Sequence, residues 1–169
     1  MYTESNIKLS CNALWQKCVL ATLYRAAATH PKIKLLQFKL IPCPGMNKAI
    51  PSLIADFTGE LHRLISEHLQ CKRRKDKSVE PTPLYYLWSR EAVANDATPY
   101  LMVLLLNNDV WCKSREVVVL RNLIEQAWGK VLDEDNSVTH LVVYPEVLSL
   151  VFDAANTYNA ELGVLEQTA

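Results

Sequence analysis

The stretch Tyr100-Leu101-Met102-Val103-Leu104-Leu105-Leu106-Asn107 decides the fold. Its apolar run is unbroken until Asn107, and Asn107-Asn108-Asp109 has the composition of a turn. A short apolar run closed by turn residues is typical of a strand buried in the middle of a sheet. A helix is the alternative, but Thr98-Pro99 in front and the asparagines behind leave too few residues for one. We therefore predict a central strand at 100–107.

A second strand is predicted immediately before this one. Leu84 to Glu91 is rich in aromatic residues and follows Pro81 and Pro83. The residues between the two strands, 92–99, are a loop of hairpin length that contains Asn95-Asp96. We therefore predict an antiparallel hairpin at the centre of the sheet.

The remaining elements follow from the spacing of apolar residues. Helical spacing predicts helices at 7–28, 51–69, 114–132 and 146–162, and short apolar segments predict strands at 33–41 and 138–144. This order predicts an α+β fold of the split β-α-β (ferredoxin-like) type, with a four-stranded antiparallel sheet and two crossover helices on one face. We expect one domain over 1–169, made of an N-terminal helix (1–30), the β-α-β-β-α-β core (32–145) and a C-terminal helix (146–162). The other sheet face is open unless the first or last helix covers it.

Composition limits the function. The 169 residues carry 18 basic and 18 acidic side chains, so the chain lacks the basic excess that is usual for proteins that bind the phosphate backbone of nucleic acids. Its five cysteines show no paired spacing, which favours reduced thiols in the cytoplasm and no metal site. No secretion signal or membrane-length apolar run is present in the sequence. We predict no cofactor.

The basic run Cys71-Lys72-Arg73-Arg74-Lys75-Asp76-Lys77 is the strongest nucleic-acid feature of the sequence. Isolated charge runs commonly form a solvated loop, which is the first interpretation. The second is a phosphate-binding loop, whose affinity would fall steeply as salt rises.

The hairpin also resembles a known family. Tyr86-Leu87-Trp88-Ser89-Arg90-Glu91, a short loop, and Tyr100 with its apolar run ending in Asn107 resemble the inovirus-type replication initiators, which include the YagK/YfjJ C-terminal domain. Ala127-Trp128 and 141–145 also look like the family pattern, and the resemblance covers roughly 32–161. It implies a relationship to endonucleases of the His-hydrophobe-His class, in which two strand histidines hold a divalent cation and a helix tyrosine attacks the phosphate.

The sequence departs from that pattern at the residues that carry the chemistry. Alignment on the apolar run puts Pro99 and Leu101 in the positions of the two histidines, and neither side chain coordinates a cation. Glu91 remains as the upstream acid and Tyr158 occupies the nucleophile position, but Glu161 replaces the family lysine. We expect Glu91 and Tyr158 to be vestigial and the protein not to be an enzyme.

These observations predict a non-catalytic binding protein of a phage or other mobile element. It would inhibit or modulate a nucleic-acid-handling host complex such as a CRISPR effector, in the manner of an anti-CRISPR protein. The alternative is a DNA-binding accessory or regulator of mobile-element replication, with single-stranded or hairpin DNA as partner; an active tyrosine nickase is a third possibility. Neither main hypothesis involves a membrane. The candidate binding residues are Lys72, Arg73, Arg74, Lys75, Lys77, Trp88, Arg90, Leu101, Val103, Gln37 and Lys39.

Overall fold

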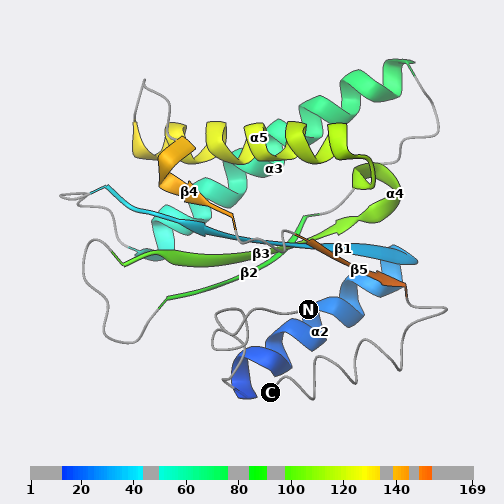
Figure 1. Ribbon diagram of the computed structural model, residues 1–169, viewed down its shortest axis with the longest axis horizontal. Helices are drawn as coiled ribbons and strands as arrows, with labels where there is room; N and C mark the ends of the chain where they lie inside the picture. The colour runs from blue at the N-terminus through cyan, green and yellow to red at the C-terminus, as the bar shows by residue number, and fades with distance from the viewer. Residues whose placement is uncertain are drawn as a thin grey trace.

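The computed structural model describes residues 13–43, 50–75, 84–90, 98–133, 139–144 and 149–153 (Figure 1). Its elements in chain order are α2 (Ala13–Thr29), β1 (Lys32–Leu40), α3 (Ile50–Lys75), β2 (Tyr85–Ser89), β3 (Tyr100–Asn107), α4 (Asn108–Trp111), α5 (Ser114–Leu132), the 3-10 turn η1 (Thr139–Leu141), β4 (Val142–Val143) and β5 (Ser149–Asp153).

The sheet is centred on the stretch that the sequence identified. Its strand order is β2-β3-β1-β4, and β5 also pairs with β1. β3 is antiparallel to both of its neighbours. Ile33 of β1 lies opposite Asn107 of β3, and Tyr85 of β2 lies opposite Leu105 of β3. This confirms the α+β class, the four antiparallel strands and the antiparallel hairpin of β2 and β3, but β2 lies at the edge of the sheet and only β3 at its centre. β3 is buried along nearly its whole length because it has strands on both sides and helices on both faces.

The two crossover helices, α3 and α5, cover one face of the sheet (Figure 1). Phe38 of β1 and Phe57 of α3 meet edge to face at 6.3 Å between ring centroids, and Phe57 meets Trp128 of α5 at 5.8 Å. The indole Nε1 of Trp128 donates a hydrogen bond to the carbonyl of Ile41, 3.0 Å away. These aromatic contacts join both helices and the sheet in one core cluster.

Ion pairs at both ends hold α3 and α5 together. Glu60, in the first half of α3, lies 3.1 Å from Lys130 in the last turn of α5. At the other end, Lys72 of α3 lies 2.5 Å from Glu116 in the first turn of α5. The two helices therefore run antiparallel, and the basic end of α3 lies beside the start of α5.

The N-terminal helix α2 covers the second face of the sheet (Figure 1). Leu23 and Ala26 of α2 form a second buried cluster with Ile33, Val103 and Leu105. The hydroxyls of Thr29 and Tyr85 are 2.9 Å apart and link the end of α2 to β2. The sequence left open whether this face is exposed or covered by a terminal helix; in the structure α2 covers it where that helix lies.

The predicted C-terminal helix at 146–162 is wrong where the structure describes it. Residues Ser149–Asp153 form strand β5, which pairs antiparallel with Lys32–Leu36 of β1. The segment Leu150-Val151-Phe152 carries residues favoured in strands. Pairing with the free edge of β1 gives the backbone N–H and C=O groups of that edge hydrogen-bond partners. Residues 146–148 and 154–162 lie outside the described part of the chain.

Three other boundaries differ from the prediction. The strand expected at 138–144 is only Val142–Val143 and follows the turn η1, so β4 and β5 share the edge of β1. The turn expected after Asn107 is the short helix α4, in which the side chain of Asn107 accepts the amide proton of Asp109. The basic run was interpreted as a loop, but its residues up to Lys75 are helical because α3 extends to Lys75.

Candidate functional site

Four of the candidate binding residues share one face of the sheet, but this patch is largely buried. Val103 lies opposite Gln37 and Leu101 opposite Lys39, so strand pairing brings the four together. Leu101 and Val103, however, are only 5% and 9% exposed, and Val103 packs in the cluster beneath α2. Gln37 is half-buried and Lys39 is exposed. A macromolecule that approaches this face would therefore meet Lys39 and not the two apolar side chains.

Trp88 and Arg90 do not belong to that patch. Trp88 lies opposite Met102, on the face covered by α3 and α5, and packs against that core 6.2 Å from the ring of Tyr100. The guanidinium of Arg90 lies 4.5 Å from the same ring, and its Nε donates to the carbonyl of Thr98. Both residues are half-buried at the hairpin, across the sheet from Leu101 and Val103.

The basic run divides into an internal and an external part. Lys72 is paired with Glu116, and its side chain is 29% exposed. Arg74 is exposed near the end of α3. The structure does not describe the side chains of Arg73 and Lys75, and Lys77 lies outside the described residues. Lys72 is therefore engaged within the fold, whereas the other cation of the run whose side chain the structure describes, Arg74, is exposed to solvent.

Glu116 is the centre of a polar cluster that the sequence analysis missed. Its carboxylate lies 2.5 Å from Lys72 Nζ and 3.6 Å from His68 Nε2, and the ring of His68 stacks on Trp111 at 5.9 Å. Burial acts to raise the pKa of Glu116, but the contacts with Lys72 and then His68 outweigh it and leave the pKa below its usual range. No sequence pattern connects positions 68, 72 and 116, because tertiary packing of α3 on α5 creates the cluster.

Replacing Glu116 by glutamine is expected to lower the free energy of unfolding by about 2 kcal/mol at pH 7, because Lys72 loses its counter-charge in a partly buried site. The folded-state pKa of Glu116 lies below its ordinary value of 4.5, so the ion pair stabilises the protein above that pH and its contribution disappears as pH falls through the folded-state pKa. Urea unfolding at several pH values measures both effects.

The control is Glu67→Gln, which removes the same charge from a surface pair. Glu67 is 60% exposed and bonds to Arg63 within α3. We expect this variant to lose less than about 0.5 kcal/mol. A difference between Glu116→Gln and the wild type that persists unchanged in acid would contradict the assigned ionisation of Glu116.

Lys34 is a second buried charge that the sequence analysis missed. It lies on β1 opposite Leu106 and is 5% exposed. Burial lowers the pKa of Lys34, and the nearby thiol of Cys112 partly opposes that shift. Lys34 therefore lies near Cys112, the C-cap residue of α4.

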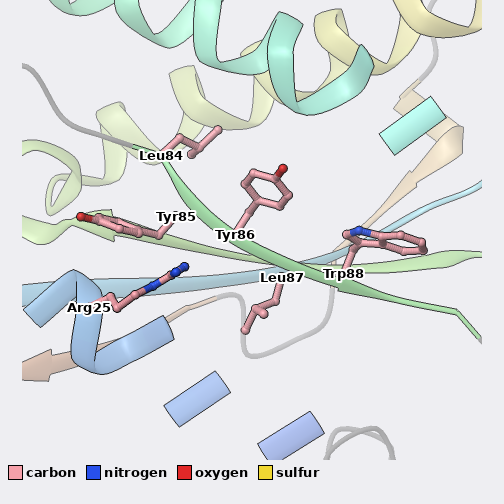
Figure 2. A pocket seen from close by; sticks show the side chains of 6 residues that line it. All are labelled: Arg25, Leu84, Tyr85, Tyr86, Leu87 and Trp88. Carbon is pink, nitrogen blue, oxygen red and sulfur yellow. The ribbon is translucent and has the colours of Figure 1, made fainter. Parts of the chain in front are cut away.

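An open hollow of about 400 Å³ lies along β2, on the outer side of the hairpin (Figure 2). Arg25 of α2 and the β2 segment Leu84–Trp88 line it. Figure 2 shows Arg25, Tyr85 and Leu87 on the side of α2, with Tyr86 and Trp88 on the opposite side. Trp88 is the one residue of this set that the sequence analysis proposed for binding; Arg25 gave no sequence signal because it reaches β2 only when α2 docks on the sheet.

Metal chemistry has no assembled site among the described residues. No group of three or more His, Cys, Asp or Glu side chains is placed there to hold an ion. Glu91 and Tyr158, the two vestigial candidates, lie outside the described part of the chain.

A family model for the YagK/YfjJ C-terminal domain matches residues 8–159. The chain belongs to the YagK/YfjJ C-terminal domain family. The match spans all described helices and strands from α2 to β5, so the domain includes the helix that covers the sheet as well as the β-α-β-β-α-β core. No curated protein and no solved structure matches the chain significantly.

Within the described residues, no helix of this family member is both long and apolar enough to cross a membrane.

Proposed function

We propose that the protein is a non-catalytic binding protein of a phage or other mobile element, built on a replication-initiator scaffold. It docks on a nucleic-acid-handling complex of the host, such as a CRISPR effector, and blocks it. The observation that carries this proposal is Leu101. Its position is that of a metal-binding histidine in the initiators that the hairpin resembles, and here it holds a hydrocarbon side chain that is 5% exposed. Such a side chain cannot coordinate the cation that phosphate cleavage requires.

Charge supports a protein partner over nucleic acid. The formal charge of the chain is zero, and Lys72, the first cation of the basic run, is neutralised by Glu116. A protein that binds the phosphate backbone depends on cations that are free to replace counterions. The hollow along β2 instead combines aromatic side chains with one arginine, a composition common at the centre of protein interfaces.

The direct test is interference with the host complex. Purified protein is titrated into a CRISPR effector of the host that is loaded with guide RNA, and binding of labelled target DNA by the effector is measured. We expect target binding to fall as the protein approaches equimolar amounts. Undiminished target binding at large excess removes the CRISPR effector as the partner.

A second candidate function, binding of DNA as a replication accessory, is favoured by one observation. Exposed Arg74 at the end of α3 lies close in sequence to Lys72, and Arg115, with a side chain 82% exposed, lies beside Glu116 at the start of α5. These cations gather at one end of the helical layer, and binding through them would weaken steeply with salt.

Fluorescence anisotropy with labelled single-stranded and hairpin DNA distinguishes the two functions. We expect no binding at low or at moderate salt. Salt-sensitive binding that is lost in Arg74→Glu and kept in Lys17→Glu, an equal charge change on exposed α2, would favour the accessory function. Incubation with supercoiled plasmid and Mn²⁺ tests for an enzyme: nicking that disappears in Tyr158→Phe would overturn the non-catalytic assignment.

A further inference from the structure

Strand β2 forms one edge of the sheet. In the order β2-β3-β1-β4 it pairs with β3 on one side, and no described strand pairs with its other side. Half of its backbone N–H and C=O groups point away from β3, as they do in any antiparallel strand. An edge of this kind is a template for an additional strand.

The composition of β2 lacks the usual protection of an edge. In natural proteins, charged side chains, prolines or bulges in an edge strand discourage another strand from pairing with it. Tyr85–Ser89 reads YYLWS and contains neither a charge nor a proline. Tyr86 is 38% exposed, so its ring is accessible at this edge. The edge is therefore open to backbone pairing within the described part of the molecule.

The hollow along this edge differs on its two sides. On the side of α2, the exposed side chain of Arg25 lies on the same side of β2 as Tyr85 and Leu87 (Figure 2). On the opposite side, the aromatic rings of Tyr86 and Trp88 point toward the helical layer (Figure 2). Successive side chains of an added strand would point alternately to these two sides.

We propose that the β2 edge captures an extended segment of a partner protein as an added strand. The segment alternates acidic and apolar residues, with the acidic side chains facing Arg25 and the apolar side chains facing Tyr86 and Trp88. Main-chain hydrogen bonds supply the affinity, and the two unlike sides select the sequence. This inference rests on the proposed function, since it names the surface and the chemistry of the protein that is bound.

Charge decides between this occupant and a second copy of the same chain. Arg25 is exposed, and within the described residues no ion pair joins it to an acidic side chain. Two copies paired β2 to β2 about a two-fold axis would bring two Arg25 side chains to the same side of the joint sheet, where like charges repel. An acidic segment on the same edge would instead place carboxylates beside Arg25, and the opposite charges would attract.

The test uses short blocked peptides of alternating leucine and glutamate, with a leucine-lysine peptide as control. Isothermal titration calorimetry measures affinity, and amide chemical shifts locate binding. We expect the acidic peptide to bind with shift changes at Tyr85–Ser89 and at Arg25. Arg25→Glu should weaken the acidic peptide about tenfold and strengthen the lysine peptide, because reversing an exposed charge replaces a weak attraction with a repulsion. Lys17→Glu, on the same helix but outside the hollow, should leave both affinities unchanged.

Backbone pairing is tested with two N-methylated acidic peptides, methylated at the glutamates or at the leucines. An added strand directs the N–H groups of only one of these sets toward β2. One methylated peptide should therefore lose binding and the other keep it. Equal effects of the two patterns, an unchanged preference in Arg25→Glu, or no binding of the acidic peptide would overturn the inference. If the protein still inhibits the effector in that case, the proposed function stands and only its surface is wrong.

Discussion

Replacing Trp128 by alanine is expected to lower the free energy of unfolding by about 4 kcal/mol, the largest effect of any single truncation proposed here. Trp128 is fully buried between α3, α5 and the sheet. The change removes edge-to-face contacts with Phe57 and Tyr100 and leaves the carbonyl of Ile41 without the indole donor. Urea unfolding followed by far-UV circular dichroism measures the loss.

Two control variants on α5 separate volume from position. Val118→Ala truncates a side chain that is 56% exposed on the same helix and should change stability by less than about 0.5 kcal/mol. Trp128→Phe keeps an aromatic ring but removes the Nε1 donor, and should fall between the two. A Trp128→Ala protein that unfolds within about 1 kcal/mol of the wild type would mean that Trp128 does not hold the helical layer on the sheet.

The helical layer was predictable from sequence because its pattern is local. The apolar residues that recur at helical spacing along α3, such as Leu53, Phe57 and Leu61, are buried in the structure, as are Leu120 and Ile124 of α5. Each stripe repeats at helical spacing within one element, so no knowledge of the partner is needed to find it. The apolar run of β3 was equally clear, because a strand with neighbours on both sides needs no polar face.

The C-terminal segment and the candidate site were not predictable in the same way. Helical spacing at 146–162 competed with the free edge of β1, and pairing prevailed over Ser149–Asp153 because it satisfies backbone groups on both strands. The Glu116–Lys72 pair and the hollow beside Arg25 each join elements that are distant in sequence. Leu101 and Val103 share one face by strand alternation, which is local, but whether α2 covered that face depended on long-range packing.

The second large effect on the free energy of unfolding is expected where α2 packs on the sheet. Leu23 of α2 and Leu105 of β3 are 1% and 0% exposed and belong to the same buried cluster. Leu23→Ala and Leu105→Ala are each expected to cost about 3 kcal/mol. The double variant should cost about 1 kcal/mol less than the sum, since removing one leucine already opens the space that the other fills. Urea unfolding of the four proteins completes this double-mutant cycle.

The control cycle pairs Leu105→Ala with Leu61→Ala. Leu61 is fully buried, but it lies in the cluster on the other face of the sheet. We therefore expect its single effect to be as large, and its coupling with Leu105 to be below about 0.5 kcal/mol. Equal coupling in both cycles, or none between Leu23 and Leu105, would mean that α2 does not seat on β3. Leu101 and Val103 would then regain the open face on which a partner could dock, and the β2 edge would lose its advantage as the binding surface.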